Sequence, residues 1–383
     1  MVPICPQDKS FLVVVHRDMF WLDHVAPFGL ATTSGLQGKV ADAIMDIWTE
    51  LGICPSAKWV DDVVLFHSPS PVLSDDVSSL CYHYNQEWAK TLIAPLGVPW
   101  HPSKGQEFDF IFSYVGFLWD IPAQTVRLTD DKHRKIVAKL STFLDDFECC
   151  QCPIKRVLSL HGSLTHISFI FPHSRSYLSS LSSFIASFSH CPADRAQEHF
   201  PPRSFWHDLC WWLCTLQLGP GLCSLTPKSP LSDLGIWVDA STDWGVSLVW
   251  QDIQVSAWCW MPGWQHAPGC DIGWGEAITI ELAILCADVL GLRDAHLLIH
   301  SDNKGIIGAF RRGRSRNFMV NQCIQCTNIV SMSRNLSFSY EYVQSEVNLA
   351  DPISHGVGIL GSSPIPIGIT LPDALSPFLT HVS

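Results

Sequence analysis

The feature that most constrains this fold is a carboxylate inside an apolar strand. Residues 235–250 read GIWVDASTDWGVSLVW, two apolar runs joined by a polar turn, which predicts a β-hairpin. Asp239 lies in the first run, where a buried carboxylate is costly unless it is paired or holds a metal. Aspartate also commonly opens turns, so the hairpin alone leaves both interpretations of Asp239 open.

Three further acids follow this hairpin in a series of predicted elements. After a strand at 255–261, a helix at 275–291 carries Glu281 and a strand at 297–302 ends in Asp302. A strand at 337–343 precedes Asp351. The order is βββ-α-β-α-β, and the acids lie too far apart in sequence for one helix or strand to hold them. Only a folded domain can bring them together.

The ordered motifs resemble the ribonuclease H (RNase H) domain of retroelement Pol polyproteins. WVDAS, IEL, HSDN and NLADP occur in that order within about residues 230–357. The resemblance implies two-metal hydrolysis of the RNA strand of RNA–DNA hybrids. Mg²⁺, or Mn²⁺, prefers oxygen ligands. The residues that would hold it are Asp239, Glu281, Asp302 and Asp351.

Glu276 is the alternative helix acid. It precedes Glu281 by five positions, so the two side chains point about 140° apart on a helix. Glu281 is preferred because it stands beside Leu282 and Ala283, as the family's helix acid does, and because its spacing to Asp302 suits the family. Glu276 would then be a first-turn acid that the helix dipole favours.

The N-terminal part resembles the palm of a reverse transcriptase, an RNA-directed DNA polymerase. PFGL and then WVDD, with Asp61 and Asp62, match the palm, and FSYVGFLWD at 112–120 matches the stretch that leads into its thumb. The wider resemblance is to gypsy-like or DIRS-like retrotransposons of a fungal type. The family's first palm acid would precede the segment that begins at Met1. Nucleotidyl transfer needs two metals held by acids from two strands, so we expect a truncated, inactive polymerase half.

Substrate contacts are predicted around the third acid and in a basic run. Ser301, Asn303 and Lys304 flank Asp302 and open a helix, a natural place for phosphate contacts. RRGRSRN at 311–317 could follow a phosphate backbone, or it could be a solvated helix end, where arginine favours the C-terminus. The arginines concerned are Arg311, Arg312, Arg314 and Arg316.

Composition limits the remaining classes. The 383 residues are 47% hydrophobic and 16% charged, which is typical of a globular protein. A net charge of −12 excludes a protein that binds nucleic acid over its whole surface, so binding must use local basic patches. Fifteen cysteines without a secretory signal indicate an intracellular compartment, cytoplasm or nucleus. Gly219 and Pro220 interrupt the uncharged stretch 209–227, so we expect no membrane span.

We therefore expect a multidomain α+β protein whose partner is an RNA–DNA hybrid or another nucleic acid. Two alternatives stay open: a degenerate, inactive retroelement fragment, and a nucleic-acid-binding module without catalysis. The sequence leaves the oligomeric state open. The expected parts are a partial palm at 1–122, a helical thumb or connection region at 123–218, a linker at 219–231, an RNase H-like domain with a mixed five-stranded sheet at 232–358, and a loose Pro-rich tail at 359–383.

Overall fold

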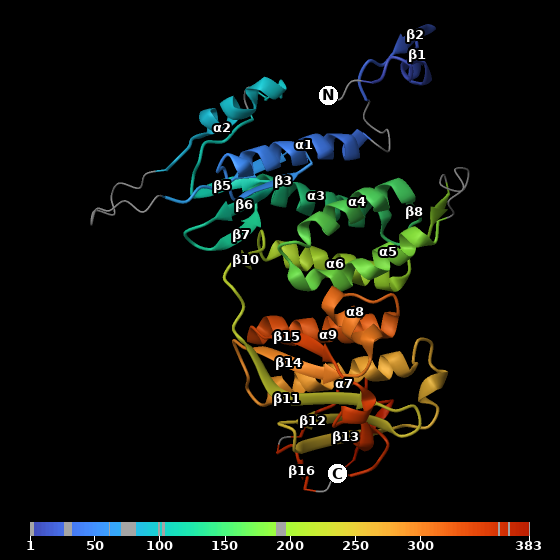
Figure 1. Ribbon diagram of the computed structural model, residues 1–383. Coiled ribbons are helices and arrows are strands. Elements are labelled where there is room, and N and C mark those ends of the chain that lie inside the picture. Colours follow the sequence, from blue (N-terminus) through green and yellow to red (C-terminus); the bar gives the residue numbers. More distant parts are fainter. Residues whose placement is uncertain are drawn as a thin grey trace. The chain divides into compact units, whose positions relative to one another are not determined.

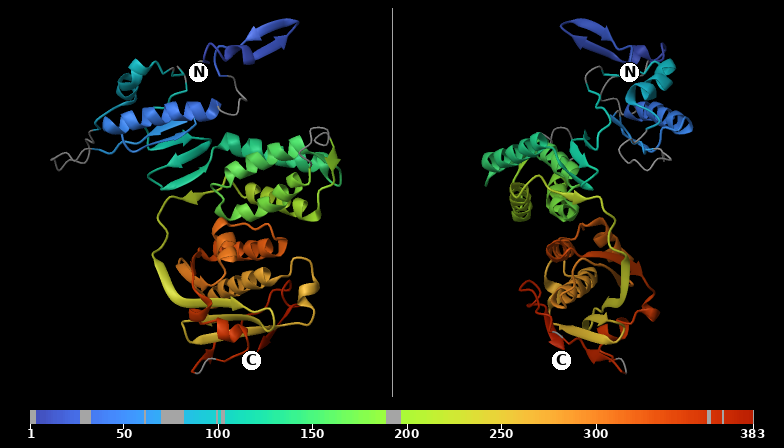
Figure 2. Two further views of the ribbon diagram at one scale, coloured as in Figure 1. Left: turned by 45° about the vertical axis from the view of Figure 1, so that its right-hand side comes forward. Right: turned by 90° about the vertical axis from the view of Figure 1, so that its left-hand side faces the viewer.

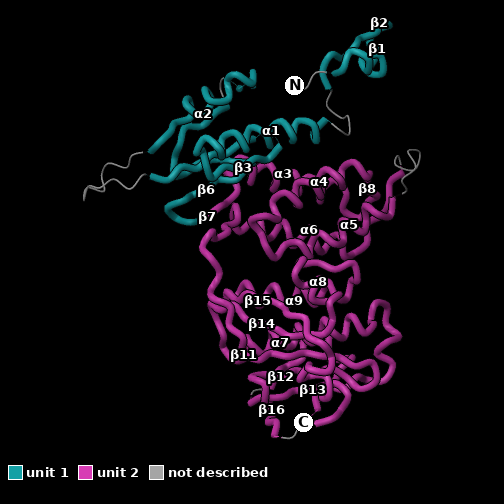
Figure 3. Tube along the Cα trace, in the orientation of Figure 1, with its two compact units in different colours: residues 1–124 teal, residues 125–383 magenta. Residues whose placement is uncertain are grey.

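The chain forms two compact units, residues 1–124 and residues 125–383 (Figure 3). The computed structural model describes residues 4–26, 33–60, 62–69, 82–98, 100–101, 104–188, 197–358, 361–366 and 368–382.

The described residues of the first unit form two longer helices and three antiparallel hairpins. Trp48 is 1% exposed, and its indole nitrogen donates a hydrogen bond of 2.9 Å to the carbonyl oxygen of Ala89. This bond ties together the two helices, whose buried apolar residues form the core of the unit. Its elements are η1 (Lys9–Phe11), β1 (Val13–His16), β2 (Met19–Leu22), α1 (Thr33–Glu50), β3 (Ser56–Trp59), β4 (Asp62–Leu65), α2 (Gln86–Ile93), η2 (Ala94–Leu96), β5 (Ile111–Tyr114) and β6 (Phe117–Asp120).

The second unit begins with a helical part. In α3 (Asp130–Phe147), the longest helix of this part, Ile136, Leu140 and Phe143 recur at helical spacing and are buried, as an amphipathic helix requires. The elements are β7 (Thr125–Leu128), α3 (Asp130–Phe147), β8 (Cys152–Pro153), α4 (Ile154–Ile167), η3 (Pro172–Leu178), α5 (Ser179–Ala186), β9 (Glu198–His199), α6 (Arg203–Gln217) and β10 (Cys223–Ser224).

An α/β part follows and is organised around one mixed sheet. The strand order is β15-β14-β11-β12-β13, in which β11, β12 and β13 are antiparallel neighbours and β14 and β15 run parallel to β11. Its elements are β11 (Leu231–Ala240), β12 (Gly245–Trp250), β13 (Gln254–Trp260), η5 (Trp264–His266), α7 (Ile272–Val289), β14 (His296–Ser301), α8 (Lys304–Arg312), α9 (Phe318–Arg334), β15 (Ser337–Tyr342), η6 (Ser345–Val347) and α10 (Asp351–Ser354).

Helix α7 is the centre of this part and lies along the sheet (Figures 1 and 2). It is apolar around almost its whole circumference, and residues 274–284 are all buried. Its core partners are apolar side chains of β11, β12, β14 and α9, including Val238, Leu248, Ile299 and Ile324. A helix that is apolar on every side must be covered on every side, and here the sheet and the other helices cover it.

The C-terminal segment is an ordered part of the sheet, which corrects two expectations. Strands β16 (Ser363–Pro364) and β17 (Leu379–Val382) both pair with β13, so the sheet has seven strands instead of five. Ile369, Leu375 and Leu379 are buried in the core of the α/β part. The segment is therefore not a loose tail, because its apolar side chains gain burial while its backbone covers the edge of β13.

The helical part packs against α9 within the same unit. Asn321 on α9 donates a hydrogen bond of 2.9 Å to the carbonyl oxygen of Ser176 on η3, and Asn328 donates one of 3.0 Å to that of His173. Asp208 on α6 is 3% exposed and accepts a bond of 3.2 Å from Gln325. Buried polar contacts of this kind fix one packing arrangement.

Candidate metal centre

Three aspartates converge at the end of the central strands. Asp239 lies in β11, Asp302 directly follows β14, and Asp351 is the first residue of α10. One carboxylate oxygen from each lies within 4.8 Å of the others. The parallel register of β11 and β14 pairs Trp237 with His300. Asp239 and Asp302 each follow two residues later, so both lie at the C-terminal ends of these neighbouring strands.

Glu276 on α7 interacts electrostatically with two of these aspartates, although it is not part of the group within 4.8 Å. It is 6% exposed, and burial raises the pKa of its carboxyl well above the usual value, with the charges of Asp239 and Asp302 raising it further. A hydrogen bond with the Asn303 side chain acts in the opposite direction. Its Oε2 atom is buried and has no hydrogen-bond partner among the described residues.

Glu281 lies elsewhere. Burial raises the pKa of Glu281 to about 7, and hydrogen bonds with the thiols of Cys323 and Cys326 on α9 lower it. The acid therefore faces α9, and the structure does not bring it together with the three aspartates. This corrects the preference for Glu281 over Glu276. The hydrophobic pattern of α7 carries no signal that separates them, because the helix is buried on all sides.

Asp239 is the most confined of the aspartates. It is 3% exposed, and burial, together with the charges of Asp302 and Asp351, raises its pKa to about 7. A hydrogen bond from the Ser354 hydroxyl opposes that rise. A buried carboxylate among other carboxylates is stabilised by a cation. Carboxylate oxygens are the ligands that Mg²⁺ prefers, so the donor set and the unpartnered Glu276 oxygen fit a divalent metal.

The residues that flank Asp302 have roles inside the protein. Ser301 is 1% exposed and accepts a hydrogen bond of 3.2 Å from the backbone nitrogen of Asn303, so it presents no surface to a phosphate. Asn303 caps α8 by accepting a bond of 3.1 Å from the nitrogen of Ile306. Lys304 is exposed, and its ammonium lies 4.2 Å from the ring centroid of Tyr342.

The basic run ends α8 and enters the turn before α9. Its arginines are all exposed. The guanidinium of Arg311 donates to the carbonyl oxygen of Tyr340, and the charge of Arg314 adds to burial in lowering the pKa of His161 in the helical part. The geometry is compatible with both interpretations, a phosphate track and a solvated helix end, so nucleic-acid contact by Arg311, Arg312, Arg314 and Arg316 stays a prediction.

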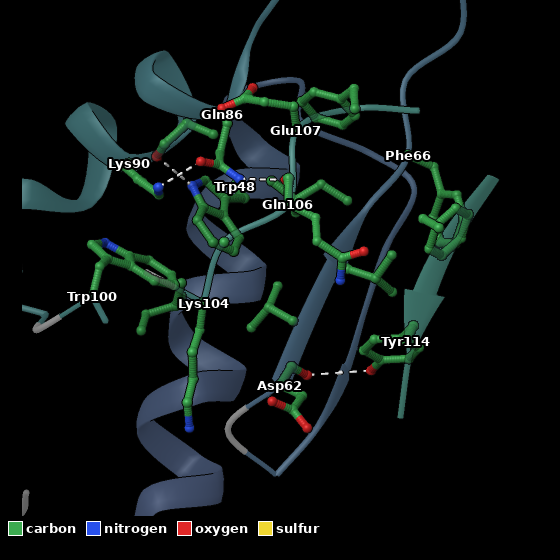
Figure 4. A pocket seen from close by; sticks show the side chains of 18 of the residues that line it. Trp48, Asp62, Phe66, Gln86, Lys90, Trp100, Lys104, Gln106, Glu107 and Tyr114 are labelled. Atoms are coloured by element: carbon green, nitrogen blue, oxygen red, sulfur yellow. Dashed lines mark hydrogen bonds between the residues drawn. The ribbon is translucent and has the colours of Figure 1, made fainter. Parts of the chain in front are cut away.

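The palm-like hairpin in the first unit shows a different environment. Asp61 lies outside the described residues. Asp62 is exposed at the start of β4, beside a cavity of about 1150 Å³ whose walls include Trp48 and Trp100 (Figure 4). The hydroxyl of Tyr114 donates a bond of 3.2 Å to the backbone oxygen of Asp62. Within the described ranges, the aspartates at 239, 302 and 351 are the one group of three or more potential metal ligands.

The part of the chain that the structure describes contains no helix with both the length and the apolar character that a membrane span needs.

No protein-family model matches this chain, and no curated protein matches it. Among solved structures, it is similar to the foamy viral protease–reverse transcriptase. The complex with an RNA/DNA hybrid is 13% identical, with a TM-score of 0.39, over 97% of this chain and 44% of that one. The complex with dsDNA is 14% identical, with a TM-score of 0.37, over 89% of this chain and 65% of that one. The complex of the foamy viral protease–reverse transcriptase dRH with dsDNA is 13% identical, with a TM-score of 0.38, over 89% of this chain and 54% of that one. The chain thus spans less than two thirds of each matched protein.

Proposed function

We propose that the α/β part hydrolyses the RNA strand of RNA–DNA hybrids with the help of divalent cations. The observation that carries this proposal is the convergence of three aspartates within 4.8 Å. The acids come from β11, from the end of β14 and from α10, in the order that the sequence motifs led us to expect. Glu276 replaces Glu281 in the proposed set, because it is the helix acid whose carboxyl interacts with Asp239 and Asp302.

The residues proposed to hold Mg²⁺ or Mn²⁺ are Asp239, Glu276, Asp302 and Asp351. When bound, a pair of such ions stabilises both the attacking and the leaving oxygen of an in-line displacement at phosphorus. Asp239, the most buried of the three aspartates, would be one of the residues that hold these cations. The chain contributes a site in which the acids are already close, and such preorganisation lowers the cost of reaching the transition state.

Recognition of the hybrid would fall to exposed groups beside this centre. Lys304 directly follows the Asp302–Asn303 pair and is exposed. The arginines at the end of α8 add positive charge to a chain whose net charge is −12, so phosphate contacts would be local and salt-dependent. An RNA strand differs from DNA by its 2′-hydroxyl groups, which a site specific for the RNA strand must contact.

We propose no nucleotidyl transfer for the first unit. Two-metal chemistry requires acids from more than one element. Asp62 comes from a single hairpin and, among the described residues, belongs to no group of three potential ligands. Primer extension on an RNA template with deoxynucleotides and Mg²⁺ should therefore give no product. Extension that Asp62→Ala abolishes would contradict this.

The decisive experiment is cleavage of an RNA–DNA hybrid with a labelled RNA strand in Mg²⁺. The native chain should cut the RNA, and Asp239→Asn should remove the activity. Asp243→Asn is the matched control, because Asp243 is an exposed acid in the turn of the same hairpin. Equal inactivity of the native chain and Asp239→Asn would refute hydrolysis. Salt-dependent binding of the uncut hybrid would then favour a binding module over an inert fragment.

A further inference from the structure

Helix α10 is too short to hold its own position. It spans only Asp351–Ser354 and contains Pro352 in its first turn. Isolated helices of this length are unstable in water, because the cost of nucleation is not recovered. Even so, Ile353 is 6% exposed, and Ser354 is completely buried. Side chains outside the helix must therefore fix the position of α10 and of Asp351.

Three buried side chains tie this segment to the residues of the β11–β12 hairpin. The Ser247 hydroxyl on β12 donates a hydrogen bond of 2.8 Å to the carbonyl oxygen of Ala350. The Ser241 hydroxyl, just after β11, donates to the carbonyl oxygen of Ser354. Asn348 donates a bond of 3.1 Å from Nδ2 to the carbonyl oxygen of Val238 on β11. These donors are between 1% and 4% exposed, so water does not compete for the bonds.

Two side chains of the same segment also reach the central acid. Asn348 Nδ2 lies 3.3 Å from Oδ1 of Asp239, and the Ser354 hydroxyl donates to Oδ2 of Asp239. The backbone oxygen of Asn348 accepts a bond of 3.1 Å from the nitrogen of Asp351. Asn348 therefore bonds to one acid through its side chain and to the other through its backbone. Ser354 holds the second oxygen of Asp239 from the far end of α10.

We propose that Asn348 and Ser354 are positioning residues, which set the separation of the Asp239 and Asp351 carboxylates before a divalent cation binds. This inference rests on the proposed cation site. Like charges at short distance repel, and side chains free to rotate would move apart. Donors on both oxygens of Asp239 restrict its rotation, while the bonds to the sheet restrict α10. Outer partners that orient metal-binding side chains typically change metal affinity by about 10- to 100-fold when removed.

The test is Mn²⁺ binding to the full chain, measured by isothermal titration calorimetry on paired variants of Ser354. Ser354→Thr and Ser354→Val have nearly the same volume and differ in the hydroxyl group. Ser354→Val should bind Mn²⁺ about 10- to 100-fold more weakly than Ser354→Thr. Asn348→Ala should weaken binding to a similar degree. Ser256→Ala is the control, because Ser256 is a buried serine on β13 whose partner, at 3.1 Å, is His381. Its affinity should stay native.

Melting temperature and circular dichroism separate positioning from a merely structural role. Equal Mn²⁺ affinity of the folded Thr and Val variants would overturn the proposal, even if Ser354→Val melts at a lower temperature. Cleavage of the hybrid distinguishes the two proposals. Weaker Mn²⁺ binding by Ser354→Val with no cleavage by the native chain leaves the positioning role and removes the hydrolytic function. Cleavage by the native chain, together with equal Mn²⁺ affinities of Ser354→Val and Ser354→Thr, leaves the hydrolytic function and removes the positioning role. No Mn²⁺ binding by the native chain removes both.

Discussion

Two hairpins of this protein carry an acid among apolar residues, and they differ in what surrounds it. Asp239 in the β11–β12 hairpin is 3% exposed and lies with acids from the end of β14, from α7 and from α10. Asp62 in the β3–β4 hairpin is exposed, and its contact from Tyr114 goes to its backbone oxygen. Hairpins with similar local sequence thus lie in different surroundings. Other elements that bring further acids make the difference.

The same contrast recurs on one helix. Glu276 and Glu281 are both buried in α7, but the first lies near Asp239 and Asp302, and the second lies near two thiols of α9. Burial raises the pKa of both carboxyls. The charges of Asp239 and Asp302 act on Glu276, whereas the groups that act on Glu281 are thiols, so the neighbours of the two carboxyls differ although both are buried.

The largest effect should separate these two glutamates in catalysis. Glu276→Gln should lower the rate of hybrid cleavage by about 1000-fold, comparable to the loss of one preorganised electrostatic group. Glu281→Gln should stay within about tenfold of native, because its carboxyl does not reach the aspartates. Single-turnover kinetics in Mg²⁺ measures both. A greater loss in Glu281→Gln would reverse the assignment.

The second effect is the dependence of stability on pH. The carboxyl of Glu281 has a folded pKa of about 7, above its ordinary 4.5. Folding therefore favours the neutral form of the Glu281 carboxyl. The contribution of this group to the free energy of unfolding is complete below pH 4.5 and is lost as the pH rises through 7. The loss is on the order of 3 kcal/mol, at about 1.4 kcal/mol per pKa unit.

Urea denaturation at pH 5 and pH 8.5 tests this for the native chain and Glu281→Gln. The native chain should lose more unfolding free energy between the two pH values than the variant. Asp239 and Glu276 shift in the same direction and are present in both chains, so the difference between the chains isolates Glu281. Parallel pH profiles would show that Glu281 does not titrate in this range.

The third effect compares the two hairpins through metal-linked stability. Mn²⁺ at about 100 times its dissociation constant should raise the unfolding free energy of the native chain by about 2.7 kcal/mol. Asp62→Asn should keep that gain, and Asp239→Asn should lose it. Urea denaturation with and without Mn²⁺, with EDTA as the reference, gives the values. A gain lost in Asp62→Asn would place a metal at the palm-like hairpin instead.

The smallest effect concerns the free energy of unfolding, and it compares the buried strand β17 with the exposed β1–β2 hairpin. Leu379 on β17 is 3% exposed in the core, whereas Val14 on β1 is 54% exposed in a hairpin whose strands are exposed throughout. Leu379→Ala should cost about 2 kcal/mol, and Val14→Ala should stay within about 0.5 kcal/mol. Urea denaturation of the two variants measures both. A loss above 1 kcal/mol in Val14→Ala would mean that β1–β2 is covered in solution.

The sequence by itself determined the order of the elements and three of the clustered acids. Alternation and helical spacing report whether a segment is buried on one face, and they predicted β11, β12, β14 and α7 to within a few residues. Asp239, Asp302 and Asp351 are indicated by the ordered motifs WVDAS, HSDN and NLADP, through the family resemblance that these motifs carry. The cost of burying a carboxylate inside an apolar strand adds a signal for Asp239, but on its own it leaves the turn interpretation open.

Only the tertiary structure decided which helix acid joins them, that Ser301 is buried, and that the C-terminal segment adds two strands to the sheet. A helix buried on every side has no polar face in its sequence, so periodicity cannot tell which of Glu276 and Glu281 points to the aspartates. The pairing of β17 with β13 depends on contacts between segments distant in sequence, as does the position of α10. Such contacts leave no local sequence pattern, because the two segments that make them lie far apart in the sequence.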